Sequence, residues 1–418
     1  MESVAIAAAL VVAYGVVSRR LESTLVTGPM AFVAAGLLLG DAGLGVLDLG
    51  LEEEGVHILA EATLVLVLFV DAIQIRLPRL VHEAQLPGRL LTVGLPGTVV
   101  LGTAAALLLF DLLPWEAALL AAVLAPTDAA LGQAVGTNPD VPVRIRETLS
   151  VESGLNDGIA LPLVTLFLGL AAGEEGVLSG RGIVSFVAMQ LGIGTLVGAL
   201  VGFVGGVVID RMARRGWMDG VFRQLSTFAV AVCAFALSEV FGGNGFIAAF
   251  VAGLAFGQVA REQCPHAADF AEDEGQLLTM LTFLVFGTSL AGPALTDGDV
   301  PTVLYAVLSL TVVRMVPVAV SLLGTGLSAL TLGFVGWFGP RGLASILFAV
   351  LIVEEADLAV ESQIVTIVSW TVLLSVFAHG MSARPAAQAY GRHVATMSDE
   401  HAEHRPDRRA AHQGPDSH

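Results

Sequence analysis

The sequence contains no lysine, and this absence excludes several classes of protein at once. All 20 of its basic residues are arginine. A phosphate-binding P-loop needs a lysine against the β- and γ-phosphates of a nucleotide, so a P-loop ATPase is excluded. Retinal and pyridoxal phosphate attach to proteins through a lysine amine, which excludes Schiff-base chemistry as well. Neither ATP hydrolysis at a P-loop nor light absorbed by retinal can therefore power this chain.

Catalytic and metal-binding patterns are also missing. The two cysteines, Cys233 and Cys264, form neither a zinc pattern nor a disulfide framework. There is no nucleophile elbow and no histidine pair with zinc spacing. The sequence therefore does not predict an enzyme, and we expect no cofactor and no nucleic-acid partner.

Charge is scarce, and apolar residues dominate. Charged residues make up 14% of the chain and hydrophobic residues 55%, with a mean hydropathy of +0.80. Apolar runs recur from end to end, and about 20 such residues suffice for a helix to cross a bilayer. The runs are continuous rather than alternating, which favours helices over strands. The sequence predicts an all-α polytopic membrane protein.

The apolar runs predict about thirteen transmembrane helices within residues 1–383. Their expected ranges are 3–17, 25–40, 56–75, 90–110, 115–135, 147–171, 183–208, 222–240, 244–260, 276–291, 301–323, 327–353 and 362–383. From Arg384 onward the chain is rich in Ala, His, Arg, Asp and Pro, so we expect residues 384–418 to form a disordered cytoplasmic tail.

The arginines indicate how these helices cross the membrane. Loops after odd-numbered spans and the tail together hold 17 arginines, whereas loops after even-numbered spans hold only Arg181. Positive residues accumulate on the cytoplasmic side of membrane proteins. We therefore expect a multi-pass protein of the plasma membrane, with its N-terminus outside and its C-terminus cytoplasmic.

One span begins with an unusual polar stretch. Glu152, Ser153, Asn156 and Asp157 occupy positions i, i+1, i+4 and i+5, which gathers them on one face of a helix. An ionised side chain near the centre of a bilayer costs about 2.5–3.5 kcal/mol on insertion scales. Two carboxylates so close together favour an ion path over a purely structural polar contact.

Two other spans are interrupted at their centres. The fifth contains Ala125-Pro126-Thr127-Asp128 and the twelfth contains Gly339-Pro340-Arg341-Gly342. Proline and glycine at these places unwind a helix and free its backbone carbonyls. The breaks are seven spans apart, so the two helices run in opposite directions, which is typical of inverted-repeat transporters. The predicted repeats are spans 1–6 and 8–13.

These motifs together resemble the cation/proton antiporters of the NhaP and NHE type. The similarity covers about residues 1–385, the whole membrane part. Besides the two breaks and the polar stretch, the similar segments are Leu237-Ser238-Glu239-Val240-Phe241-Gly242-Gly243-Asn244-Gly245-Phe246, Val313-Arg314 and Phe377-Ala378-His379-Gly380-Met381. The resemblance implies an NhaA/NhaP-like fold with crossed broken helices, a homodimer, and sodium/proton exchange by alternating access.

Asp157 is the expected carrier of the transported ion. A carboxylate in a partly desolvated cavity can hold a proton or a cation but not both, and this exclusion couples the two. Sodium is a hard cation that prefers oxygen ligands. We expect these from Asp157, the Ser153 hydroxyl and the Thr127 carbonyl, with Asp128 or Glu152 contributing directly or through water, and the resemblance implies the same set.

Asn156 predicts the stoichiometry, because electrogenic relatives of this family carry aspartate at its position. A neutral amide there implies electroneutral exchange of one cation for one proton. The alternatives are potassium/proton exchange and, in a different class, a gated cation channel, which the lack of a repeated filter loop disfavours.

The charges that accompany the site must be compensated, because an isolated buried charge is costly. The resemblance implies that Arg314 pairs with Glu152. Arg341, at the break of the twelfth span, could neutralise either Asp128 or the carbonyls exposed at that break, and the pairings of the two arginines could be exchanged. Three further acids lie within spans. Glu61 and Asp71 could both line the outer or inner funnel, although a packing or interfacial position is favoured for Asp71, and Glu239 is expected at the interface.

Overall fold

The computed structural model describes residues 2–21, 24–47, 54–75, 85–173, 180–260, 265–355, 358, 360–397 and 401–403. All regular secondary structure in these ranges is helical. The elements are α1 (Glu2–Leu21), α2 (Gly28–Leu39), α3 (Glu54–Gln74), α5 (Gln85–Arg89), η1 (Leu90–Gly94), α6 (Leu95–Leu109), α7 (Pro114–Val123), α8 (Ala129–Gly136), α9 (Val143–Ala171), α11 (Gly180–Arg214), α12 (Gly220–Val240), α13 (Gly245–Val259), α14 (Pro265–Val285), η2 (Phe286–Ala291), α15 (Gly292–Asp297), α16 (Val300–Leu310), α17 (Val312–Ser321), α18 (Ala329–Trp337), α19 (Leu343–Glu355) and α20 (Glu361–Val394).

The predicted spans are confirmed as helices. Each expected range coincides with one helix or with consecutive helical pieces in the described part of the chain. Among the described residues, eight helices are long and apolar enough to cross a membrane, and four shorter apolar helices accompany them. Helices α9, α11 and α20 extend beyond the expected spans because their polar ends continue the helix past the apolar segment.

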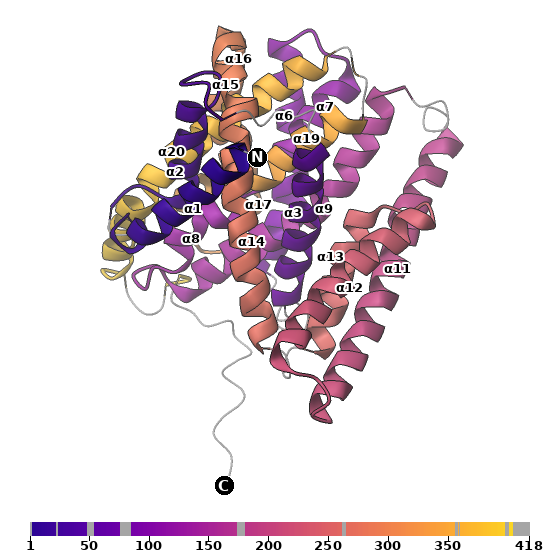
Figure 1. The fold of residues 1–418 in the computed structure, drawn as a ribbon. Helices are drawn as coiled ribbons and strands as arrows, with labels where there is room; N and C mark the ends of the chain where they lie inside the picture. Colours follow the sequence, from indigo (N-terminus) through magenta and orange to yellow (C-terminus); the bar gives the residue numbers. More distant parts are fainter. Residues whose placement is uncertain are drawn as a thin grey trace.

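The two predicted breaks are present and give the fold its inverted repeat. The fifth span is split into α7 and α8 by residues 124–128, and the twelfth into α18 and α19 by residues 338–342. The breaks cross, because Asp128 N donates a hydrogen bond to Pro340 O at 2.8 Å. In Figure 1, α7 and α19 lie close to each other in the upper part of the view, above α3 and α9.

Three further interruptions were not predicted. The fourth span contains the π-helical turn η1, and the tenth contains the π-helical turn η2. The eleventh span is divided at Thr311, where φ is −113° and ψ is −94°, just before Arg314. Proline and glycine do lie beside the two π-helical turns, with Pro96-Gly97 after η1 and Gly292-Pro293 after η2, so the sequence carried a signal there that was not used. No proline or glycine adjoins Thr311.

Helices α11, α12 and α13 lie side by side on one flank of the molecule (Figure 1). Glycines on α11 face the backbone of α13, and a Cβ atom at Gly198 or Gly202 would collide with the carbonyl oxygen of Ala248 or Ala252. Small residues four apart let membrane helices approach closely, where apolar burial gives no driving force against lipid. Helix α13 packs in turn on α3.

The predicted start of the disordered tail, at residue 384, is too early in the chain. Helix α20 continues to Val394, Ala387 and Tyr390 are buried, and the Tyr390 ring stacks on Phe334 of α18, so disorder was wrong for residues 384–394. Composition misled here because the polar residues lie on only part of the helix surface. The predicted disorder of residues 404–418, with their histidines and arginines, falls outside the described residues, as do Arg76, Arg79, Arg261 and Cys264.

Candidate ion-binding site

Helix α9 carries the polar face that the sequence predicted. Its side chains Glu152, Ser153, Asn156 and Asp157 are all buried. They lie well inside α9, which starts at Val143, so their backbone is regularly helical. This rigidity fixes the four side chains relative to one another.

Two hydrogen bonds fasten the first break to this face. Ser153 Oγ donates to the backbone carbonyl of Thr127 at 2.6 Å. Asn156 Nδ2 donates to Thr127 Oγ1, also at 2.6 Å. The carbonyl that the break frees from α7 is therefore placed directly against Ser153, as the expected ligand set requires.

Asp157 lies next to this junction with an oxygen that lacks a donor. Its side chain is 8% exposed, and among the described residues no group donates a hydrogen bond to Oδ1. It lines the same cavity as Thr127 and Ser153. A buried carboxylate oxygen without a donor is costly, and either a proton or a bound cation removes that cost. The three predicted sodium ligands are thus together in space.

Asp128 has a different arrangement. Its Oδ1 accepts hydrogen bonds from Ala130 N at 2.7 Å and Leu131 N at 3.2 Å, which caps α8. Its Oδ2 accepts from Leu343 N at 2.6 Å, which caps α19. One carboxylate thus satisfies the first amides of both half-helices, and negative charge is favourable at helix N-termini. This geometry favours a scaffold role over direct ligation.

Arg341 donates hydrogen bonds to backbone carbonyls that the first break leaves without helical donors. Its Nη1 donates to Ala125 O at 3.0 Å and to Pro126 O at 3.1 Å. These carbonyls belong to the first break, whereas the sequence had suggested Asp128 or the carbonyls of the second break as partners of Arg341. Each break therefore satisfies the orphan backbone groups of the other.

Arg314 neutralises Glu152. Its Nη1 lies 2.6 Å from Glu152 Oε1, with both side chains buried. This is the pairing that the resemblance implied. Glu152 thus has one oxygen paired with a cationic side chain, and it does not line the cavity that contains Asp157.

A cavity of about 330 Å³ leads to Asp157. It lies between α3 and α14 on one side and α8, α9 and the two breaks on the other. Polar side chains that the sequence did not single out line its wall, namely Gln74, Gln133, Ser150, Gln276 and Thr279. Asp71 also lines it, rather than filling the packing position expected for it. Polar residues spread over four helices have no common spacing, so the sequence could not group them.

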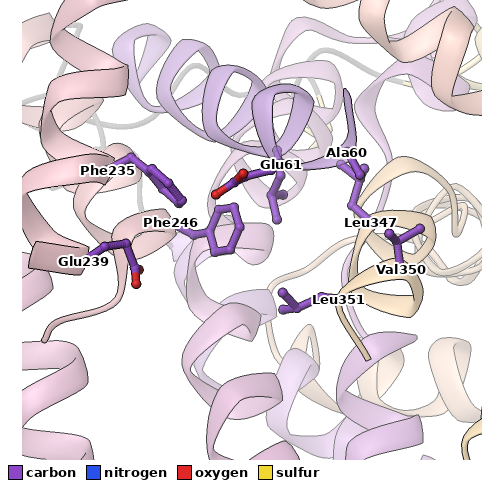
Figure 2. Close-up of a pocket in the computed structure, with 9 residues that line it drawn as sticks. Ala60, Glu61, Phe235, Glu239, Phe246, Leu347, Val350 and Leu351 are labelled. Atoms are coloured by element: carbon purple, nitrogen blue, oxygen red, sulfur yellow. The ribbon is translucent and has the colours of Figure 1, made fainter. Parts of the chain in front are cut away.

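A second, smaller cavity of about 120 Å³ lies further along α3 and α19. Figure 2 shows the carboxylates of Glu61 and Glu239 on its wall, together with the rings of Phe235 and Phe246. Asp157 is absent from its lining. Along α3 the second cavity touches residues 60–64, whereas the first touches 67–74, so the two lie end to end on the same seam.

Two serines that the sequence analysis did not identify complete the crossing. Ser345 Oγ donates to Val123 O at 2.8 Å, and Ser375 Oγ accepts from Arg341 N at 2.7 Å. Both have apolar neighbours in the sequence, where a serine is common. Their function becomes visible only when the two breaks are seen together.

The structure combines crossed half-helices, buried acids at the crossing and a cavity that leads to these acids. This combination defines the class of ion-coupled secondary transporters. The family of transmembrane sodium/hydrogen exchangers matches residues 6–389, and the chain belongs to this family.

Relatives and solved structures agree with this assignment. The chain is 26% identical over 364 residues to the K(+)/H(+) antiporter NhaP of Alkalimonas amylolytica, covering 86% of this chain and 62% of that protein. It is 26% identical over 380 residues to the Na(+)/H(+) antiporter 2 of Zygosaccharomyces rouxii, covering 80% and 46%. The chain thus spans less than two thirds of these relatives. The sodium proton antiporter MjNhaP1 of Methanocaldococcus jannaschii shares the fold, with a TM-score of 0.76 at 20% identity over 91% of this chain and 99% of that one.

Proposed function

We propose that this protein is a secondary antiporter that exchanges a monovalent cation, sodium in the first instance, for a proton at Asp157. The observation that carries the proposal is the buried Asp157 oxygen without a donor, beside Ser153 and the Thr127 carbonyl in a cavity. Sodium would be held by Asp157, Ser153 and Thr127, and a proton on Asp157 would displace it.

The two cavities support alternating access. Asp157 lines only the larger one, while the smaller lies further along the same seam between α3 and α19. A shift of the crossed half-helices along α3 would bring the site towards the smaller cavity, where Glu61 and Glu239 would attract cations. Because both cavities are lined by α3 and α19, one movement can close one and open the other.

We further propose the orientation and assembly. The arginine distribution supports an N-terminus outside and residues 384–418 in the cytoplasm, and in that orientation the larger cavity would open inward. Residues 1–383 would form the transport domain, in the plasma membrane, as a homodimer. With Asn156 neutral, exchange would be electroneutral, with one proton for each cation.

Asp157→Asn tests the proposal. In proteoliposomes with an internal pH dye, pulses of sodium, potassium or lithium should move protons through the wild-type protein and not through this variant. Asp111→Asn is the control, because Asp111 is exposed and lines neither cavity. Cation-driven proton movement that persists in Asp157→Asn would refute the role of Asp157.

Potassium/proton exchange is a second candidate, and the similarity to the K(+)/H(+) antiporter NhaP favours it. Carboxylate, hydroxyl and carbonyl oxygens bind either cation. The same pulses separate the two, because the transported cation alone drives proton movement. Cation flux without proton movement would instead indicate a channel.

A further inference from the structure

The second break is held by a chain of hydrogen bonds to α20. At one end, Trp337 O accepts from Gly339 N and lies 2.8 Å from His379 Nε2. At the other end, Arg341 N donates to Ser375 Oγ at 2.7 Å. His379 and Ser375 are one helical turn apart on α20, and Ser375 Oγ lies 3.2 Å from His379 Nδ1. Together they bridge the unwound segment from Trp337 to Arg341.

The partners and the burial of His379 together indicate which ring nitrogen carries the proton. A carbonyl oxygen only accepts, so Nε2 must donate to Trp337 O. Nδ1 has two neighbours on Ser375, the hydroxyl oxygen at 3.2 Å and the backbone carbonyl oxygen at 3.0 Å. Protonating both ring nitrogens would place a charge on a side chain that is 1% exposed, which is costly, so we assign Nδ1 as the acceptor of the Ser375 hydroxyl proton. A neutral imidazole with its proton on Nε2 completes the chain without any change of charge.

Packing keeps the ring of His379 in place. It is 1% exposed and stacks on Trp337, with ring centroids 4.7 Å apart and an interplanar angle of 26°. Trp337 is fixed from its other edge, because its Nε1 donates to Ser382 Oγ at 2.9 Å. The last residue of α18 is thus locked to α20 on both sides.

The hydrogen bonds that Ser375 and His379 make to the second break, called the clamp from here on, control the position of Arg341 at the crossing. Its backbone nitrogen is held by Ser375, while its guanidinium reaches the carbonyls of Ala125 and Pro126. The next carbonyl along the first break is that of Thr127, which faces Ser153. A displacement of the second break is therefore transmitted to the carbonyl beside Asp157.

We infer that His379 is a positioning residue for cation binding, which sets the Thr127 carbonyl through Trp337, Ser375 and Arg341 without itself gaining or losing a proton. The inference rests on the proposed function and goes beyond it, because His379 lies on α20 and touches no expected ligand of the cation. In this inference, His379 keeps the geometry of the binding site fixed and takes no part in proton transfer.

The test compares His379→Gln with His379→Leu in proteoliposomes. The glutamine amide nitrogen can occupy the place of Nε2 and donate to Trp337 O, whereas leucine has no donor. We expect His379→Leu to raise the half-saturating cation concentration about five- to tenfold, the loss associated with one hydrogen bond. His379→Gln should stay within about twofold of the wild type, with an unchanged pH profile.

Several results would overturn the inference. A folded His379→Leu protein with wild-type half-saturation would show that the clamp does not act on the site. A glutamine variant as defective as leucine would show that the donor to Trp337 O is not what matters. A shifted pH profile in His379→Gln would mean that the histidine titrates during transport.

Two further variants keep the test decisive. Ser375→Ala removes the acceptor of Arg341 N and should raise half-saturation similarly even if His379→Leu does not fold, and unaltered half-saturation there would contradict the inference. Met381→Leu, at an exposed position of the same helix, should behave as the wild type. Asp157→Asn is measured alongside the other variants. If cation-driven proton movement persists in Asp157→Asn, the proposed ion site is wrong; if it is lost there, a negative result for His379 and Ser375 counts against the clamp alone.

Discussion

Arg314 Nη1 lies 2.6 Å from Glu152 Oε1, and their side chains are only 1% and 3% exposed. This ion pair joins α17 to α9, two segments far apart in the sequence, next to the crossing of the broken helices. A buried pair of this kind contributes little net stability by itself, but removal of one partner leaves the other charge uncompensated.

Glu152→Gln should therefore destabilise the protein by about 3–5 kcal/mol, because the buried guanidinium of Arg314 loses its counter-charge. The double variant Glu152→Gln with Arg314→Gln should recover much of that loss. Thermal unfolding in detergent measures both, with Glu147→Gln, an exposed position of the same helix, as control. Equal stability of the single and double variants would show that the pair is not coupled.

Gly342→Ala should disrupt the crossing, because a Cβ atom at this position would overlap the carboxylate of Asp128. That carboxylate caps both half-helices, so the added methyl must displace it from Leu343 N or move the break. Overpacking of this kind costs about 1–3 kcal/mol, and we expect transport to fall more steeply than stability. Gly333→Ala on α18, where a Cβ meets nothing within 4 Å, is the matched control and should transport normally.

Asn156→Asp should make transport electrogenic. The Thr127 hydroxyl, which now accepts from the amide, can turn to donate to a carboxylate, so the site can retain its contacts. A second acid beside Asp157 adds a proton-binding group, and the exchange of one cation would then move net charge. A membrane-potential dye in proteoliposomes should respond in this variant and remain silent for the wild type and for Asn138→Asp. A signal from the wild type would contradict electroneutral exchange.

Glu403 docks the end of the described chain on α18. Its Oε1 accepts from Ser328 N and Thr331 Oγ1, both at 2.8 Å, and Arg144 Nη1 donates to the adjacent carbonyl of Ala402. Burial raises the pKa of Glu403, but these hydrogen bonds outweigh it and hold the pKa below its usual range.

The docking should therefore be complete above about pH 4.3, the ordinary pKa of glutamate, and weaken as the pH falls through the lowered pKa of Glu403. Glu403→Gln should mimic the protonated state at neutral pH. Hydrogen exchange at the Ser328 amide should accelerate in this variant by about tenfold, because a charge-assisted bond is replaced by a neutral one. Glu147→Gln again serves as control, and unchanged exchange at Ser328 would show that the carboxylate charge does not hold the tail.

The helical spans and the two breaks were predictable because their signals are local. A run of about 20 apolar residues is a property of one segment. Pro126 and Pro340 with their neighbouring glycine or polar residues likewise act on their own helix. The end of α20 was predicted less well, because Ala387 and Tyr390 are buried by neighbouring elements that composition does not reveal.

The candidate ligands were predictable for a related reason. Ser153, Asn156 and Asp157 lie on one face of one helix, and the cost of placing such groups in a membrane marks that face as functional. Asp128 was counted among the possible ligands, since its spacing does not show that it would cap α19 as well as α8.

The sequence by itself determined the transmembrane helices, the places where two of them unwind and the acid that faces the crossing, because hydrophobicity, helix breaking and helical periodicity act over a few neighbouring residues. Only the tertiary structure decided that Arg341 holds carbonyls rather than Asp128, that His379 closes the second break and that the cavity leading to Asp157 lies against α3 and α14. These depend on segments such as Asp128 and Leu343, 215 residues apart along the chain, meeting at hydrogen-bonding distance.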